Sequence, residues 1–396
     1  MRKQIVIGVV AAIAVAILPA TMATTSSAAI DYSKCTDLKS CGGMDALVKA
    51  AQKEGHLNAI TLPRNWANYG EAMDLFSKAF GIKITDDNPD GSSGYEITTI
   101  SSAPASKVPD QTDIGITYGI NNVNLFAPYK AQSWKDIPAN YKEPKGRWVG
   151  SYAGQMAIQY PVGLPKSPTK LADLADPAFK GMFAIGGDPV QAQESKMSVF
   201  AANLAAGGTS DNIQKGIDWF KSLKASGNFV TVPATPANFT AGAYKVSLTW
   251  DFNCPGNIAA AAKAGVTLKC VIPSDAILQG TPYVTGIPVN APHPATARLW
   301  TEFLYSGIKG KFSKDLGSTK GMSGSKIFSM IMGGQNIWIS GGAHPITEVA
   351  MRTRGTAINP PAGVIPAMGK SVTPNVAQQD AGTALLKDQW PAIAAN

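Results

Sequence analysis

Aromatic and acidic residues at the ends of apolar runs carry the most suggestive chemistry in this chain. Trp66 and Tyr69 follow an apolar run at residues 56–62, and Asp251 ends a second run. Aromatic rings stack on methylene groups and attract ammonium ions, and a carboxylate pairs with each positive charge. These residues therefore predict a site for a small organic ligand with cationic groups.

Other candidates come from further predicted strand ends, where ligands bind in open α/β sheets. We expect the ligand to contact Arg64, Asn65, Trp66, Tyr69, Thr117, Tyr118, Asp188, Trp250, Asp251, Phe252 and Tyr283. Structural roles stay open for some of them: Trp66, Tyr69 and Trp250 also suit a core, and Asp188 and Asp251 also suit caps. Arg64 favours a different ligand, because a guanidinium binds a carboxylate or phosphonate bidentately.

Strand-like and helix-like segments alternate along the chain and must position these residues. Helical spacing of apolar residues appears at 45–55, 71–80, 211–226 and from 293 onward. Strands are predicted at 56–62, 81–84, 113–118, 153–160, 181–185, 246–250, 268–273 and 282–289. Asp188 before Pro189 predicts the N-cap of a helix that runs toward residue 206. This alternation indicates an α/β fold with parallel βαβ units.

The start of the chain has the layout of a secretory signal. A short basic segment precedes an apolar run at residues 5–18, and small residues follow up to Ala28 and Ala29. We expect a signal peptide at residues 1–29, with a retained anchor as the alternative. Cys35 follows Tyr32, Ser33 and Lys34, so no lipoprotein box is apparent. The predicted location is the periplasm or the outer face of the cell envelope.

Composition narrows the class of protein. The length of 396 residues suggests two domains. The formal net charge of +8 is scattered, without the clustered basic surface that indicates nucleic-acid binding. We expect a monomer without a cofactor or a bound metal. His56, His293 and His344 are far apart in the sequence and are interpreted as structural.

Four cysteines are compatible with disulfides in an exported protein. Cys35 and Cys41 form one local pair, and Cys254 and Cys270 form another. Four cysteines allow three connectivities, of which the two local pairings are expected. A zinc site is disfavoured because no C-x-x-C motif or histidine cluster accompanies them.

Catalytic motifs give no support for an enzyme. The chain lacks a G-x-S-x-G elbow, an H-E-x-x-H motif and a Walker A loop. An exported hydrolase and a surface adhesin remain as alternatives from other functional classes.

Several stretches in a specific order resemble the extracellular solute-binding proteins of ABC importers, in the branch with polyamine- and iron(III)-binding members. They are residues 66–71, 88–93, 181–189, 248–252, 291–295, 302–306, 334–338 and 341–346. The resemblance implies two α/β lobes (type II) joined by two crossing hinge strands, at residues 155–160 and 283–289. Lobe 1 would comprise residues 30–154 and 286–396, and lobe 2 residues 155–285. Residues 307–333 depart from the family pattern as a lysine- and glycine-rich insertion, either a solvated surface or a contact surface.

The resemblance also implies a function. A small polar solute, best a polyamine such as putrescine or spermidine, would bind between the lobes and pass to the transmembrane permease subunits. The spacing of Trp66 and Tyr69 resembles the aromatic box of polyamine binders. A small carboxylate, an aminoalkylphosphonate or iron(III) is the alternative ligand, although the paired tyrosines common in iron binders are missing.

Overall fold

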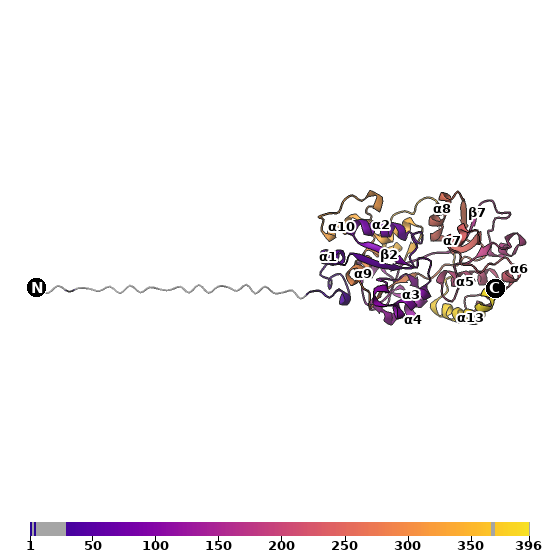
Figure 1. Ribbon diagram of the computed structural model, residues 1–396, viewed down its shortest axis with the longest axis horizontal. Helices are drawn as coiled ribbons and strands as arrows, with labels where there is room; N and C mark the ends of the chain where they lie inside the picture. The colour runs from indigo at the N-terminus through magenta and orange to yellow at the C-terminus, as the bar shows by residue number, and fades with distance from the viewer. Residues whose placement is uncertain (2–3, 5–28, 366–368, 396) are drawn as a thin grey trace. The chain divides into compact units, whose positions relative to one another are not determined.

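The computed structural model describes residues 1, 4, 29–365 and 369–395 (Figure 1). Met1–Ile30 and Asp31–Asn396 are two separate units, and all elements below belong to the second. The predicted signal peptide at residues 1–29 lies almost entirely outside the described residues. Among the residues described, no helix combines the length and the apolar character that a membrane span needs.

Helices follow the apolar periodicity of the sequence closely. They are α1 (Met44–Glu54), α2 (Tyr69–Phe80), α3 (Ser93–Ser102), α4 (Ile116–Asn121), α5 (Gln193–Ala205), α6 (Gln214–Ser226), α7 (Pro236–Thr240), α8 (Cys254–Lys263), α9 (Pro294–Leu304), α10 (Gly324–Met330), α11 (Gly334–Ser340), α12 (Glu348–Thr353) and α13 (Val376–Ala394). The helices predicted at residues 45–55, 71–80, 211–226 and from 293 are confirmed as α1, α2, α6 and α9.

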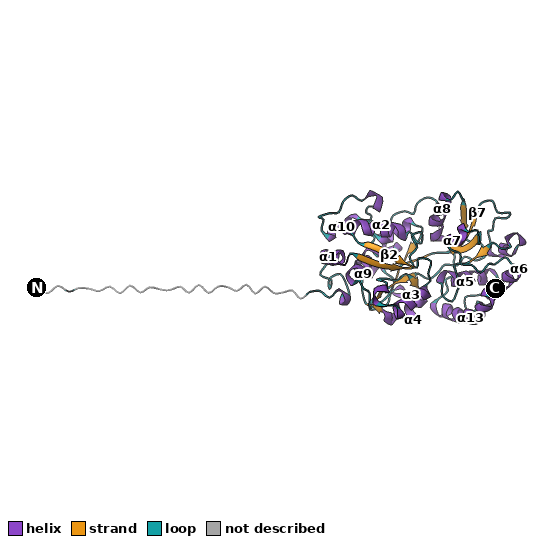
Figure 2. Cartoon of the chain, in the orientation of Figure 1, coloured by secondary structure: helices purple, strands orange, loops and turns teal. Residues whose placement is uncertain are grey.

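Short strands pair into several small sheets (Figure 2). The strands are β1 (His56–Ile60), β2 (Lys83–Asp87), β3 (Ile114–Gly115), β4 (Phe126–Ala127), β5 (Val149–Gly150), β6 (Tyr152–Ala153), β7 (Met156–Pro161), β8 (Phe183–Ala184), β9 (Val246–Trp250), β10 (Leu268–Val271), β11 (Tyr283–Thr285), β12 (Ile287–Pro288) and β13 (His344–Pro345). The sheet orders are β1-β2, β10-β7-β9-β8, β3-β11-β5, β12-β4 and β13-β6. The predicted α/β class is confirmed.

The β1–α2–β2 unit positions the loop that carries Trp66. Strands β1 and β2 are parallel, with His56 opposite Lys83, as the alternation of segments predicts. Helix α2 buries Phe76 and Phe80 on one face and ends at Gly81, where φ is 70°. A left-handed backbone favours glycine at such a C-cap, because other residues meet a steric penalty from Cβ.

The four-stranded sheet forms the other wall of the region described below. Central β7 is antiparallel to both β9 and β10, while β8 is parallel to β9. All five residues of β9 are buried, including the polar Ser247 and Thr249. Helix α5 packs on β7 and β9, and α8 packs on β10.

Two predicted local structures are wrong. The strand expected at residues 113–118 is limited to Ile114–Gly115, and Thr117 and Tyr118 lie in α4. Strand β11 pairs there only with Ile114 and Gly115, so the chain beyond them forms helical hydrogen bonds instead. Tertiary pairing thus overrides the apolar pattern.

The helix expected from Asp188 begins five residues later, at Gln193. The Asp188 carboxylate accepts a hydrogen bond from the Val190 amide (2.8 Å), and its carbonyl accepts from the Gln191 amide (3.0 Å). These bonds close a separate turn, so Asp188 caps that turn and not α5.

Residues 307–333 are folded against the body of the unit. The Ser313 amide donates to the Glu71 carboxylate on α2 (2.7 Å), and the Ser325 amide donates to Asp45 on α1 (2.6 Å). The insertion therefore covers α1 and α2.

The C-terminal helix α13 packs against α6, with the rings of Trp390 and Phe220 5.3 Å apart, and also contacts α4. The lobe boundaries stay a prediction, and this packing favours grouping α13 with α6 and residues 155–285.

Candidate functional site

A cavity of about 640 Å³ lies between the β1–α2 loop and the start of α3 on one side and β7, β9, α5 and α8 on the other. This size is typical of sites for small organic ligands. Three of the predicted ligand residues line it: Asn65, Trp66 and Tyr283. They come from segments far apart in the sequence, so the tertiary fold creates the site.

Trp66 is held in place by its polar edge. Its indole Nε1 donates to the Tyr152 hydroxyl (2.8 Å), and its ring meets Phe252 and Tyr283 edge to face, with centroids 5.6 and 5.5 Å apart. The indole is therefore pre-oriented at the wall of the cavity, where a ligand meets a rigid ring without an ordering cost.

Other predicted aromatic residues lie in the core behind this wall. Tyr69 is fully buried, Trp250 and Phe252 are each 1% exposed, and none of them lines the cavity. Trp250 Nε1 donates to the Tyr283 hydroxyl (3.1 Å). Thr117, in α4, is also buried. Their predicted contact with a ligand stays a prediction, and the structure gives them packing and orienting roles.

Asp251 is buried and does not line the cavity. Its Oδ1 accepts hydrogen bonds from the amides of Gln155 (3.0 Å) and Phe252 (2.8 Å), while Oδ2 has no hydrogen-bond partner. Burial raises the pKa of this carboxyl to about 6, against the opposing effect of nearby His344 and the two amides. Through the bond from the Gln155 amide, Asp251 links the end of β9 to the start of β7 and holds these two segments together.

Arg64, Tyr118 and Asp188 also lie outside the lining. Arg64 forms an exposed ion pair with Asp74 (2.6 Å), and the Tyr118 hydroxyl donates to the Val190 carbonyl (2.7 Å). Arg64 is thus engaged away from the cavity.

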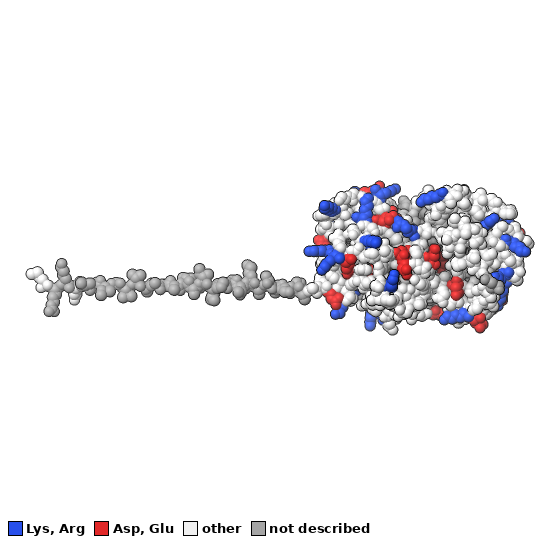
Figure 3. Space-filling model, viewed as in Figure 1, with Lys and Arg blue, Asp and Glu red and all other residues white. Residues whose placement is uncertain are grey.

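Four carboxyl groups that the sequence reasoning missed line the cavity: the exposed Asp90, and Glu96 in α3, Asp113 before β3 and Glu194 in α5, which are buried or half-buried. Glu96 is fully buried; its Oε2 accepts from the Asp113 amide (3.2 Å) and its Oε1 has no hydrogen-bond partner. Asp113 Oδ2 accepts from the Tyr152 hydroxyl (2.5 Å). Figure 3 shows exposed acidic side chains near the middle of the drawn face, in addition to the buried carboxyls of Glu96 and Asp113.

Burial disfavours ionisation of Glu96, Asp113 and Glu194. It raises the pKa of Asp113 to about 7, although tyrosine hydroxyls oppose the shift. It also raises the pKa of Glu194 to about 7, against hydrogen bonds from Thr249 and Trp250, and raises the pKa of Glu96 well above its usual range. Perturbed acids in a cavity are typical of functional sites, because a ligand can supply the charge that burial removes.

Tyr283 lies among Glu96, Asp113 and Glu194. Burial raises its pKa, and the charges of Glu194, Asp113 and Glu96 raise it further. Lys245 is the only basic side chain among the described residues that line the cavity. The chemistry of the wall therefore favours a donor-rich, positively charged ligand over an anion.

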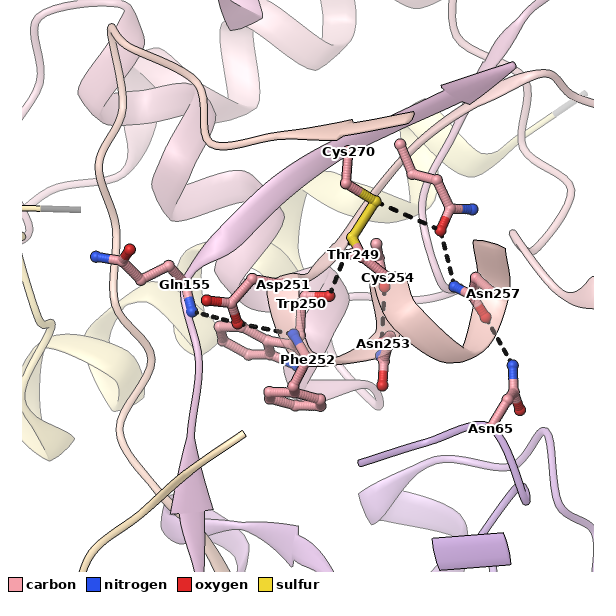
Figure 4. Close-up of a disulfide and its surroundings, with 11 residues drawn as sticks. Asn65, Gln155, Thr249, Trp250, Asp251, Phe252, Asn253, Cys254, Asn257 and Cys270 are labelled. Atoms are coloured by element: carbon pink, nitrogen blue, oxygen red, sulfur yellow. Dashed lines mark hydrogen bonds between the residues drawn. A yellow bond between two sulfur atoms is a disulfide. The ribbon is translucent and has the colours of Figure 1, made fainter. Parts of the chain in front are cut away.

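A chain of amides crosses the cavity beside the disulfide (Figure 4). Asn65 Nδ2 donates to Asn257 Oδ1 (2.7 Å), and Asn257 Nδ2 donates to Gln159 Oε1 (2.8 Å). This amide chain joins the β1–α2 loop to α8 and β7. The predicted Cys254–Cys270 disulfide is present and ties α8 to β10.

The predicted Cys35–Cys41 disulfide is wrong in this structure. Both thiols are free and buried; burial raises the pKa of Cys41, and a hydrogen bond with Cys35 raises it further. Reduced, packed thiols behave as small apolar groups, which suits their place beside α9.

Sequence signals for the missed acids are weak. Glu194 lies at the start of α5, a helix buried on most faces that nevertheless carries Gln193, Ser195 and Lys196. Polar residues in such a helix hint at a lined cavity. Glu96 and Asp113 sit in ordinary helix-start and strand-start contexts and gave no comparable signal.

The three histidines are not all far apart in the fold. The rings of His56 and His293 lie 5.5 Å apart, and Asp110 bonds His293 Nδ1 at 2.9 Å. His344 lies apart from them, facing Glu348. Within the described part of the chain, no three His, Cys, Asp or Glu side chains come together as metal ligands.

The chain is similar in sequence to known bacterial binding proteins. A family model described as bacterial extracellular solute-binding protein matches residues 120–315. The Fe(3+)-binding periplasmic protein of Serratia marcescens is 28% identical over 158 residues, which cover 39% of this chain and only 44% of that protein.

Solved structures extend the comparison to most of the chain. The binding protein AgtB of A. tumefacien R10, in complex with agropinic acid, has a TM-score of 0.59 at 16% identity, over 86% of this chain and 98% of AgtB. AfuA of Actinobacillus pleuropneumoniae, with fructose-6-phosphate bound, has a TM-score of 0.57 at 17% identity, over 86% of this chain and 97% of AfuA. The predicted two-lobe binding-protein fold is confirmed.

Proposed function

We propose, from the premise that this chain belongs to the bacterial extracellular solute-binding proteins, that it captures a small polar organic solute for an ABC importer. The solute binds in the cavity beside Trp66 and Tyr283, and the loaded protein docks on the permease subunits. The protein acts as a monomer outside the cytoplasmic membrane and performs no catalytic step.

A cation is the solute that the cavity suits best, and polyamines such as putrescine and spermidine are the first candidates. The observation that carries this proposal is the set of carboxyls around Tyr283, namely the buried Glu96 and Asp113 and the half-buried Glu194. A bound ammonium group would donate to the unpartnered Glu96 Oε1, which otherwise costs free energy of desolvation. The rings of Trp66 and Tyr283 supply cation–π contacts of about 0.5–2 kcal/mol each.

Capture would involve closure about the chain crossings at residues 155–160 and 283–289. The Asn65–Asn257 hydrogen bond (2.7 Å) already joins the two sides of the cavity, as expected of a closed form. A ligand that contacts both sides stabilises this form by its differential affinity for it.

Two other ligand types remain candidates because relatives bind them. The Serratia marcescens relative is named for iron(III), and the AfuA and AgtB structures hold fructose-6-phosphate and agropinic acid. Against an anion, Arg64 is paired with Asp74 outside the cavity. Against a bare ferric ion, the cavity has a volume of about 640 Å³, which leaves room for an organic molecule.

A thermal-shift screen of the purified chain, refolded to release carried ligand, tests the proposal. The panel comprises putrescine, spermidine, iron(III) citrate, fructose-6-phosphate and aminoethylphosphonate. A ligand at about 100 times its dissociation constant adds roughly 2.7 kcal/mol of stability. Stabilisation by amines, lost in Glu194→Gln, supports the proposal. Stabilisation by iron or anions alone contradicts the cationic solute while leaving the binding role intact.

A further inference from the structure

The cavity has two chemically different ends. One end is formed by α3, the start of β3 and the start of α5, and it contains Glu96, Asp113 and Glu194. The other end is formed by the end of β7, α8 and β10. The two ends differ in the charge of their lining side chains, and this difference limits where a positively charged group of the ligand can bind.

At the acidic end, two buried side-chain oxygens accept no hydrogen bond from the protein. Glu96 Oε1 and Gln193 Oε1 have no hydrogen-bond partner, and both residues are at most 2% exposed. Gln193 Nε2 is already committed to Gln379 (2.9 Å), so this side chain presents its oxygen to the cavity. A buried acceptor without a donor destabilises the free protein, and a ligand with N–H donors removes this cost.

At the opposite end, the lining residues of β7, α8 and β10 carry no charged side chain, and the nearest charged lining residue is Lys245, just before β9, whose Ser247 pairs with Gln159. This end consists of Pro161, Val162, Gly163, Leu164, Ala260, Ala261, Ala264, Val266 and Leu268, with the amides of Gln159, Asn253 and Asn257. Val162 is 52% exposed, so its apolar side chain is accessible to a ligand. A second ammonium group would find no anion here.

The amide chain includes Gln159 and Asn257 of this opposite end and has little acceptor capacity to spare. Asn257 Oδ1 and Gln159 Oε1 already accept hydrogen bonds from Asn65 and Asn257. A ligand lying along this chain meets mainly apolar surface and satisfied amides.

Strand β7 gives the distance between the ends. Ala157 pairs with Thr249, whose hydroxyl bonds Glu194, and Pro161 pairs with Leu268. These pairs are four residues apart on β7, or about 13 Å at about 3.3 Å per residue. A small molecule of metabolite size can span this length.

We propose that the solute is an amphipathic organic cation, with a single positively charged N–H donor head at the acidic end and an uncharged apolar body along α8. This inference rests on the proposed function and narrows it. A linear polyamine carries a charge at both ends, and its second ammonium would lie against the uncharged wall, where desolvation has no compensating anion.

Isothermal titration calorimetry with amines of matched length tests the inference. The probes are 1-aminohexane, 2-phenylethylamine, 1,6-diaminohexane and hexanoate, titrated into the refolded full chain. We expect both monoamines to bind at least roughly tenfold more tightly than the diamine, and hexanoate not to bind. A diamine that binds as tightly as 1-aminohexane overturns this inference but supports the proposed cationic solute. Failure of every amine overturns both.

A gain-of-charge variant gives a second, independent readout. Ala260→Glu places a carboxylate on the exposed, cavity-lining face of α8, where alanine and glutamate both favour helix. We expect it to raise the affinity for 1,6-diaminohexane relative to 1-aminohexane by roughly tenfold. Ala259→Glu is the matched control, since Ala259 is exposed on the same helix but does not line the cavity. Equal effects of the two substitutions would overturn the assignment of this end.

Discussion

Two groups of residues meet at the cavity and behave in opposite ways. The aromatic group, Trp66, Tyr69, Tyr152, Trp250, Phe252 and Tyr283, packs ring against ring, and most of its members are inaccessible to a ligand. The acidic group, Glu96, Asp113 and Glu194, faces the cavity with raised pKa values. Aromatic rings are stabilised by packing against one another, whereas a buried carboxyl needs a hydrogen-bond donor or a positive charge beside it. We therefore expect the aromatic group to supply rigidity and the acidic group to supply recognition.

Trp250→Ala should have the largest effect, and on stability. The indole is 1% exposed, stacks near Phe252 and donates to Tyr283. Removing such a core aromatic costs about 3–5 kcal/mol of unfolding free energy, measured by urea denaturation. Val289→Ala is the control, because Val289 is 58% exposed and should change stability little. Equal stability of Trp250→Ala and the wild type would show that the aromatic group is not structural.

Glu194→Gln should act on binding and not on folding. The amide keeps the shape but removes the charge that pairs with a cation, so affinity for amines should fall roughly tenfold or more. Calorimetry measures the affinity, and denaturation should show unchanged or slightly greater stability, since burial disfavours the carboxylate. Asp188→Asn is the matched control at an exposed turn. An equal loss in both variants would contradict a specific role of Glu194.

The pH dependence should separate free and loaded protein. The pKa values of Asp113 and Glu194, about 7 in the fold, lie above the values of about 4 in unfolded chains. Their contribution to stability is full below about pH 4 and is lost as pH rises through about 7. From pH 5 to 8, thermal stability of the free protein should therefore fall from this source while amine affinity rises severalfold. Amine affinity that falls with rising pH would contradict recognition by these acids.

Arg64→Ala should have the smallest effect. The ion pair with Asp74 is exposed, and such pairs contribute about 0–1 kcal/mol. Affinity for amines and for carboxylates should both stay unchanged in calorimetry. A selective loss of carboxylate binding would instead revive the anion alternative that Arg64 suggests in the sequence.

Much of the fold was readable from the sequence because local patterns agree with it. The periodicity of α1, α2, α6 and α9, the buried run of β9 and the parallel β1–α2–β2 unit all follow from side-chain spacing. The predictions that were wrong concern segments where tertiary pairing decides. Thr117 and Tyr118 lie in a helix because β11 pairs with only two residues before them.

Some residues of the candidate site could likewise be predicted from the sequence, whereas others could not. The amino-acid sequence is sufficient to place Asn65 and Trp66 in the loop after β1 and Tyr283 in a strand, β11. All three residues line the cavity. Only the tertiary structure decided that Trp250 and Asp251 turn into the core and that Glu96, Asp113 and Glu194 gather around Tyr283. Residue type and spacing specify local elements, but burial and contact between segments such as those of Asn65 and Asn257, 192 residues apart, depend on how those elements pack.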